Sequence, residues 1–266
     1  GNALFRATNP ERIIIGKQSK SFRPSKKLIN FLNNYNCEII EMTYEESELT
    51  KTFINIYLAS QLITTNNLSN ISKSLNCDWN KIKSALKLDK RIGNFSYINP
   101  GLGISGGNIE RDIKTLKDLS GDLGLKRNYF NLLINDNRFY KNWLFRSIVK
   151  HKYRNKKIGI LGITYKEDTL SCKNAASIEL IKQLNLNKVF LHDRRLKNLN
   201  LPKKIFNRFF DLDYIINNCD CLIVLHNINT YKKINFNQPN ISMVIDPFKI
   251  FRINNNKIKY LSLTDS

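Results

Sequence analysis

The sequence predicts an α/β protein in which an all-helical central domain separates two segments of alternating strands and helices. Short β-branched runs alternate with helix-length stretches in residues 1–42, and the same alternation returns in residues 153–266. Between them, residues 43–152 carry apolar side chains at helical spacing almost throughout. We therefore expect three domains with these boundaries.

The first segment is predicted to form a strand, a helix and a second strand. Residues 12–16 are a β-branched run that ends in glycine, and residues 37–42 are a second apolar run. Pro24 can open the helix between them, because proline fits the first turn of a helix, where a backbone N–H would have no partner.

The central domain is predicted to begin with a helix of about 30 residues, which is longer than most globular helices. Thr43 and Glu46 have the spacing of a capping box, in which each side chain accepts a hydrogen bond from the other residue's backbone N–H. Apolar residues then recur at helical period as far as Ile71. A helix of this length suggests a domain junction or a subunit interface.

The rest of the central domain is predicted to hold shorter helices around one loop. Asp78 is placed to cap a helix that contains Trp79. A glycine-rich loop follows at residues 99–107, and further helices are expected at about 109–119 and 128–152.

The last domain is predicted to be a parallel, helix-covered sheet of the Rossmann-like kind. Its apolar strands are expected at residues 157–162, 189–193, 221–226 and 242–246, separated by helix-length segments such as 177–184. Ligands of such sheets bind beyond the carboxyl ends of the strands. Asp193 ends a strand, as a ribose-binding acid does, but residues 159–162 do not make the glycine pattern of a dinucleotide site.

The composition is that of a globular chain with a strong positive charge, +21 at pH 7. Such a charge raises the alternative of nucleic-acid binding, yet the lysines are spread along the chain and no nucleic-acid motif accompanies them. A basic chain also suits an anionic nucleotide diphosphate. We expect no membrane span, because no apolar run approaches the roughly 20 residues that one needs.

Cysteine and histidine usage indicates neither disulfides nor a metal site. The five cysteines form no CxxC pair, so we expect reduced and mostly buried thiols in a cytoplasmic protein. His151, His192 and His226 have no shared metal-ligand spacing, and we interpret them as structural or surface residues.

The segment with the clearest chemical content is the loop at 99–107 and the helix after it. Four glycines within seven residues allow a ligand to approach the backbone closely. A helix that starts near Asn108 would direct free N–H groups at an anion or a developing oxyanion.

This loop resembles the active-site loop of the UDP-glucose/GDP-mannose 6-dehydrogenases, roughly Pro-x-x-Gly-x-Gly-Gly-x-Cys-x-x-Lys-Asp. Gly103, Gly106, Arg111 and Asp112 fall into register with it. Other segments match the family in the same order along the chain: residues 9–16, 48–55, 89–93, 161–169 and 244–246. The family's N-terminal NAD-binding domain is the part without a match, and residues 1–42 resemble its closing segment.

The resemblance implies oxidation of a sugar CH2OH to a carboxylate by two hydride transfers to NAD. A cysteine thiolate attacks the intermediate aldehyde, and the resulting thiohemiacetal is oxidised to a thioester that water hydrolyses. By position, Lys51 and Asn55 are the expected oxyanion pair, and Asp112 is or supports the base. Lys51 and Asn55 are four residues apart, so they share a helix face.

The resemblance also implies substrate contacts and an assembly. Arg91 matches an arginine that reaches the ligand of a neighbouring subunit, and Gly103, Gly106, Tyr165 and Lys166 match residues that line the UDP-sugar site. Lys173 lies where the family usually has an arginine, and we assign it as a cofactor contact. We predict a homodimer through residues 43–74, as the family forms.

Asn108 stands where the family keeps its nucleophilic cysteine. A carboxamide cannot serve as the nucleophile, so we expect a divergent UDP-sugar-binding member that does not complete the two-step oxidation. Further departures agree with this expectation, namely Asn67, Leu170, Ser171, Lys173 and Phe248. Two alternatives stay open: a dehydrogenase that stops at the aldehyde, and a basic binding module without enzymatic activity.

Overall fold

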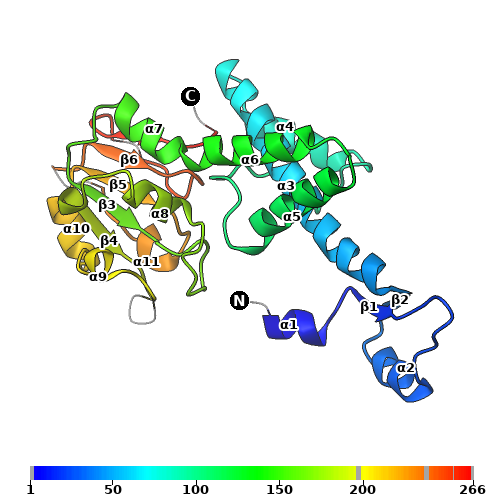
Figure 1. Ribbon diagram of the computed structural model, residues 1–266. Coiled ribbons are helices and arrows are strands. Elements are labelled where there is room, and N and C mark those ends of the chain that lie inside the picture. The colour runs from blue at the N-terminus through cyan, green and yellow to red at the C-terminus, as the bar shows by residue number, and fades with distance from the viewer. Residues whose placement is uncertain (1–2, 196–198, 237–239, 254, 265–266) are drawn as a thin grey trace. The chain divides into compact units, whose positions relative to one another are not determined.

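Two parallel strands, β1 (Arg12–Lys17) and β2 (Glu38–Thr43), and the helix α2 (Lys26–Asn33) between them form the centre of the N-terminal unit (Figure 1). A short helix α1 (Ala3–Thr8) precedes them. Ser25 caps α2 by accepting a hydrogen bond from the backbone N–H of Leu28. The predicted strand–helix–strand unit is therefore confirmed.

Helix α3 (Tyr44–Ser74) follows directly and has 31 residues. The predicted capping box is present, because the Thr43 N–H donates to Glu46 Oε2 at 2.7 Å and the Glu46 N–H donates to Thr43 Oγ1 at 3.3 Å. The computed structural model describes residues 3–195, 199–236, 240–253 and 255–264. The chain divides into two units, residues 1–57 and 58–266, with the division inside α3.

Four more helices complete the helical region: α4 (Trp79–Leu88), α5 (Asn108–Asp122), α6 (Asn128–Lys141) and α7 (Trp143–Lys150). Asp78 caps α4, as predicted, by accepting a hydrogen bond from the Asn80 N–H at 2.8 Å. The expectation of a single helix over 128–152 is wrong, because Asn142, with ψ of 3°, separates α6 from α7. The Asn142 side chain accepts a hydrogen bond from Gln183, a tertiary contact that helical periodicity cannot reveal.

The C-terminal sheet has five parallel strands in the order β4-β3-β5-β6-β7 (Figure 1). They are β3 (Ile158–Leu161), β4 (Val189–His192), β5 (Cys221–Val224), β6 (Met243–Ile245) and β7 (Lys259–Leu261). The predicted parallel sheet is confirmed, and the three-residue β7 is an addition that the sequence pattern did not indicate. The connecting helices are α8 (Ala176–Ile181), η1 (Leu186–Lys188), α9 (Lys203–Phe206), α10 (Leu212–Asn218) and α11 (Asn229–Lys232).

Both faces of this sheet are buried, because alternate side chains of each strand point to opposite faces. Ile160 belongs to one apolar cluster and Leu161 to the other. Gly159 lies where the side chains of Ile215 and Leu222 occupy the space that a Cβ would need, so α10 packs directly on the strand. Burial of each such side chain stabilises the fold by about 1.5–3 kcal/mol.

Candidate functional site

The glycine-rich loop ends at helix α5, which begins at Asn108 as predicted. Gly107 occupies the N-cap position and supplies no side-chain acceptor, so no cap bonds to the first N–H groups of the helix. Asn108 is exposed at this end. The start of α5 therefore presents partial positive charge at the residue that the sequence analysis assigned to the nucleophile position.

Asn137 of α6 fixes the conformation of the loop. Its Oδ1 accepts a hydrogen bond from the Ile104 N–H at 2.6 Å. The same oxygen lies only 2.6 Å from where a Cβ on Gly103 would be, and Gly103 has a φ of +78°. Only glycine fits this position without strain. The structure thus gives Gly103 a role in shaping the loop.

Glu110, in the first turn of α5, connects three parts of the second unit. Its carboxylate accepts a hydrogen bond from Asn137 Nδ2 at 2.7 Å, pairs with Lys141, and accepts a further hydrogen bond from Asn174. An acid in the first turn is also favoured by the helix dipole. Sequence reasoning missed Glu110 and Asn174 because their partners lie far away along the chain.

The segment after β3 contacts the glycine loop through one backbone and one side-chain hydrogen bond. The Gly106 N–H donates to the Lys173 carbonyl at 3.0 Å, and Asn174 Nδ2 donates to the Gly106 carbonyl at 2.9 Å. The side chain of Lys173 lies along Gly107, with its Nζ 2.9 Å from the place of a Cβ on that glycine. Lys173 therefore brings an ammonium group to Gly107, the residue that precedes the first residue of α5.

Tyr165 and Lys166 extend this site. The ring of Tyr165 lies 3.6 Å from the place of a Cβ on Gly106, which is ordinary van der Waals contact. The Lys166 Nζ lies 5.3 Å from the centre of the same ring, and Lys166 is exposed. The structure thus brings Gly106, Tyr165 and Lys173 together, with Lys166 at the Tyr165 ring. Two ammonium groups and a helix start with no side-chain cap favour an anionic ligand.

Asp112 lies one helical turn after Asn108 and is buried. Its Oδ1 accepts hydrogen bonds from two guanidinium nitrogens of Arg111, each at 3.1 Å. Lys51 and Asn55 belong to the N-terminal unit, where they lie one turn apart on α3, as predicted. Asn55 is buried and Lys51 is exposed.

Arg91 follows α4 and extends from the surface, with 89% of its side chain exposed. It forms a two-point ion pair with Asp89, with Nε 3.0 Å from Oδ1 and the second nitrogen 2.7 Å from Oδ2. These hydrogen bonds raise the pKa of Arg91 and lower the pKa of Asp89. The ion pair orders an outward-facing guanidinium.

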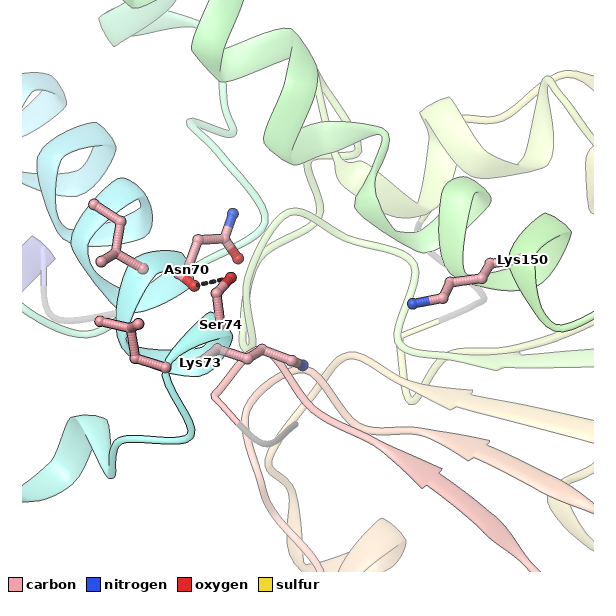
Figure 2. Close-up of a pocket in the computed structure, with 6 residues that line it drawn as sticks. Asn70, Lys73, Ser74 and Lys150 are labelled. Carbon is pink, nitrogen blue, oxygen red and sulfur yellow. Dashed lines mark hydrogen bonds between the residues drawn. The ribbon is translucent and has the colours of Figure 1, made fainter.

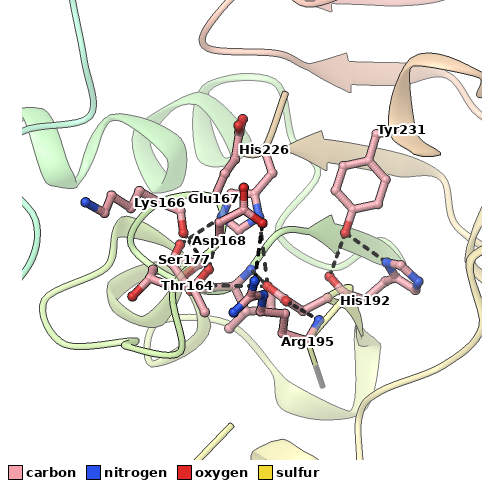
Figure 3. Close-up of polar contacts among 12 residues, drawn as sticks. Thr164, Lys166, Glu167, Asp168, Ser177, His192, Arg195, His226 and Tyr231 are labelled. Carbon is pink, nitrogen blue, oxygen red and sulfur yellow. Dashed lines mark hydrogen bonds and ion pairs between the residues drawn. The ribbon is translucent and has the colours of Figure 1, made fainter. Parts of the chain in front are cut away.

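Buried polar groups fix the loop that follows β3 (Figure 3). Asp193, directly after β4, accepts a hydrogen bond from the Ile163 N–H at 2.8 Å. The His226 Nε2 lies 3.0 Å from the Thr164 carbonyl oxygen, and the Ser177 hydroxyl donates to the Ile163 carbonyl. The loop that carries Tyr165 and Lys166 is therefore positioned from three neighbouring elements.

The turn after β3 does not fit the pyrophosphate of NAD. Gly162 has a φ of +92°, and its Cβ position lies 2.5 Å from the ring of His226. Dinucleotide folds use glycine at this turn so that the pyrophosphate can approach the backbone. Here an imidazole occupies that space.

The surroundings of Cys172 disfavour its thiolate form. Its burial, together with the negative charge of Asp193, raises the pKa of the thiol to about 11, and the side chain packs against the sheet core. All five cysteines are free, but only Cys219 and Cys221 are fully buried, so the expectation of mostly buried thiols holds for two of them. Among the residues that the structure describes, no group of His, Cys, Asp and Glu could hold a metal ion.

A separate surface hollow of about 720 Å³ lies at the end of α3 (Figure 2) and contains none of the predicted site residues. Ile71 and Leu75 contribute its apolar part. Its charged residues are Lys73 and Lys150, which Figure 2 labels. Within the described ranges, no helix combines the length and apolarity that crossing a bilayer requires.

Two family models match this chain. The central domain of the UDP-glucose/GDP-mannose dehydrogenase family matches residues 45–138, and the UDP binding domain of the same family matches residues 159–253. UDP-glucose 6-dehydrogenase 4 of Arabidopsis thaliana is 27% identical over 80% of this chain and 47% of its own length. The UDP-glucose 6-dehydrogenase of Rickettsia bellii is 26% identical over 69% of this chain and 43% of its own length.

Solved structures show the same fold. A UDP-glucose dehydrogenase from Pyrobaculum islandicum superposes with a TM-score of 0.79 at 20% identity, covering 99% of this chain and 61% of that one. An NDP-N-acetyl-D-galactosaminuronic acid dehydrogenase from Methanosarcina mazei gives 0.77 at 17% identity, covering 100% of this chain and 60% of that one. The chain spans less than half the length of the two curated relatives named above. On the strength of both domain matches, the chain belongs to the UDP-glucose/GDP-mannose dehydrogenase family.

Proposed function

We propose that this chain binds a UDP-sugar at the junction of the glycine loop and the segment after β3. The family consists of NAD-dependent dehydrogenases, and its UDP binding domain is present here. The observation that carries the proposal is the position of Lys173, whose ammonium lies against Gly107 at the start of α5. A diphosphate would be bound by this ammonium, the free N–H groups of α5 and Lys166.

The sugar end of the ligand is proposed to lie at Asn108. An amide nitrogen shares its lone pair with the neighbouring carbonyl, so Asn108 cannot add to an aldehyde as a thiolate does. Asn108 can donate and accept hydrogen bonds, and it can therefore orient the sugar without bonding to it covalently. On this proposal the second oxidation is blocked for lack of a thiohemiacetal.

Binding of UDP-glucose, measured by isothermal titration calorimetry on the full chain, tests the proposal. Lys173→Ala and Lys166→Ala should each weaken binding about tenfold, because each removes one charged contact to the diphosphate. Lys204→Ala, which changes an exposed lysine of α9, is the matched control and should leave the affinity unchanged. If all three variants bound UDP-glucose with the affinity of the wild type, the proposed site would be refuted.

The dehydrogenase that stops at the aldehyde is a second candidate, favoured by the retained and buried Asp112. Abstraction of the hydroxyl proton needs a base but no thiolate. On a chain that carries a cofactor domain, NADH formation from UDP-glucose that stops at the aldehyde would support this candidate. If no NADH formed while UDP-glucose still bound, this candidate would be refuted and only the binding function would remain.

If the chain does not bind a UDP-sugar, its net charge of +21 favours a nucleic-acid-binding module instead. Titration with single-stranded RNA across salt concentrations separates the two, since phosphate-backbone binding weakens steeply with salt. We expect RNA binding to be weak and unaffected by Lys173→Ala.

We also propose a homodimer through α3. In the C-terminal unit, Leu68 and Ile71 are exposed three residues apart, and Leu75 follows the helix at 68% exposed. The hollow beside them offers an apolar surface flanked by lysines. Light scattering should show a dimer at micromolar concentration, and Ile71→Asp should convert it to a monomer. A wild-type monomer would contradict this part of the proposal.

A further inference from the structure

A cavity of about 360 Å³ lies at the carboxyl end of β4, outside the proposed UDP-sugar site. It is lined by His192, Asp193, Phe209, Phe210, Asp211 and Tyr214. Neither the glycine loop nor Tyr165, Lys166 or Lys173 contributes to this lining. The cavity is therefore a separate feature of the sheet domain.

The backbone places this cavity at a recurrent ligand position of doubly wound sheets. Phe209 forms a parallel bridge with Leu191, and the Leu191 N–H and carbonyl bond to Arg208 and Phe210 at 2.8 and 2.9 Å. Residues 208–210 thus lie beside β4 as a further strand position at that edge of the sheet. In the strand numbering of a doubly wound sheet, β3 then corresponds to strand 1 and β4 to strand 2. In such sheets ligands bind in the crevice outside the carboxyl ends of the strands.

The aromatic residues of the cavity suit a planar base. The rings of Phe210 and Tyr214 are stacked, with centroids 4.9 Å apart and planes 14° apart. Tyr214 is 45% exposed, so part of its ring is open to a ligand. Any of the nucleic-acid bases can stack on an exposed aromatic side chain, because every base has a π-face.

The polar residues suit the hydroxyls of a ribose. Asp193 is occupied, because its two oxygens accept hydrogen bonds from the Ile163 and Arg195 N–H groups at 2.8 and 2.9 Å. Asp211 precedes α10 without capping it and is exposed. No side chain or backbone group among the described residues bonds to the Asp211 carboxylate. It is therefore the acceptor available to two neighbouring hydroxyls.

The charges of the cavity lining and the neighbouring turn disfavour a dinucleotide. The lining contains two carboxylates and no lysine or arginine, and burial lowers the pKa of His192, which favours the neutral imidazole. His226 fills the turn after β3, where a pyrophosphate would lie. The chemistry therefore favours a nucleoside over a nucleotide.

We propose that this cavity binds a nucleoside, with the base stacked on Tyr214 and the ribose diol donating to Asp211. The site does not depend on the UDP-sugar site, and it would be a second ligand site on the same domain.

Calorimetric titration of the full chain with adenosine tests the proposal, and we expect saturable binding. Tyr214→Ala should weaken it at least about tenfold through lost stacking, whereas Tyr214→Phe should preserve it. Asp211→Asn should weaken adenosine binding about tenfold and weaken 2′-deoxyadenosine binding by a smaller factor, because the deoxynucleoside retains only one of the two hydroxyls that the carboxylate recognises.

Asp213→Asn is the matched control, since Asp213 is an exposed acid on α10 outside the cavity lining. It should bind adenosine as the wild type does. Absence of saturable binding, or equal affinities in the wild type, Tyr214→Ala and Asp211→Asn, would overturn the proposal. UDP-glucose titrated into the same samples separates the two sites, because loss of UDP-glucose binding alone would refute only the proposed function.

Discussion

Two glycine turns of the second unit have similar backbones but different neighbours. Gly106, before α5, and Gly162, after β3, both have positive φ, at +86° and +92°. At Gly106 the nearest ring, that of Tyr165, is in ordinary contact, and the adjacent Gly107 meets only the flexible side chain of Lys173. At Gly162 the imidazole of His226 fills the space at 2.5 Å.

The difference shows that a glycine at a turn indicates that some group comes close to the backbone, but it does not identify that group. Before α5 the space lies beside the flexible end of the Lys173 side chain, so a ligand can share it. We call this turn the open turn. After β3 the space is occupied by the buried ring of His226, which is held by a hydrogen bond with Thr164. We call this turn the closed turn. Substitutions at the two turns should therefore have different consequences.

The largest expected effect is that of Gly162→Ala, which should lower the free energy of unfolding by about 3 kcal/mol. The alanine would be strained at its positive φ, and its Cβ would collide with the His226 ring. Urea denaturation measures the loss. Part of it should disappear when the same change is made in a His226→Ala background. Equal losses in both backgrounds would show that the ring does not close the turn.

An intermediate effect is expected for Asn108→Cys, which tests the electrostatics of the open turn. The new thiol would lie at the start of α5 beside Lys173, and its pKa should fall below 8.5 by about one unit. The pH dependence of alkylation, followed by mass mapping, reports this pKa. Adding Lys173→Ala should return it towards 8.5. An unperturbed thiol in the single variant would argue against a positive site.

A smaller effect is expected for Gly107→Ala, which should cost about 0.5 kcal/mol of stability. Gly107 has a negative φ of −104°, and only the Lys173 side chain must move to admit a methyl group. That movement should weaken UDP-glucose binding while the fold persists. A loss of stability as large as that of Gly162→Ala would remove the contrast between the turns.

The smallest expected effect concerns pH and the closed turn. His192, whose carbonyl accepts the Gly162 N–H, has a pKa lowered by burial. Between its folded pKa and 6.5 the unfolded chain binds more protons, so the free energy of unfolding should decline as pH falls below about 6.5. Denaturation as a function of pH should show a shallower decline for His192→Asn. His151, whose pKa burial also lowers, is the comparison variant.

Local pattern was enough to predict most elements. The capping box of Thr43 and Glu46, the Asp78 cap and the start of α5 at Asn108 all depend on residues within four positions of each other. The break at Asn142 and strand β7 escaped prediction. Asn142 bonds to Gln183, and β7 has only three residues, so neither leaves a periodic signal.

The candidate site was only partly predictable. Gly106, Tyr165 and Lys173 were indicated by the family motif, and the structure brings them together. The division of the chain into three domains and the roles of Lys51, Asn55 and Arg91 stay predictions. Glu110 and Asn174 were missed, since hydrogen bonds across 64 residues of chain have no local signature.

The sequence by itself determined the order of the elements, the parallel sheet and the family, because periodicity, caps and motif spacing are properties of neighbouring residues. Only the tertiary structure decided which glycine turn is open and which is closed. That outcome depends on where Lys173 and His226 lie relative to Gly107 and Gly162. Packing between distant segments sets those positions, and no local pattern encodes them.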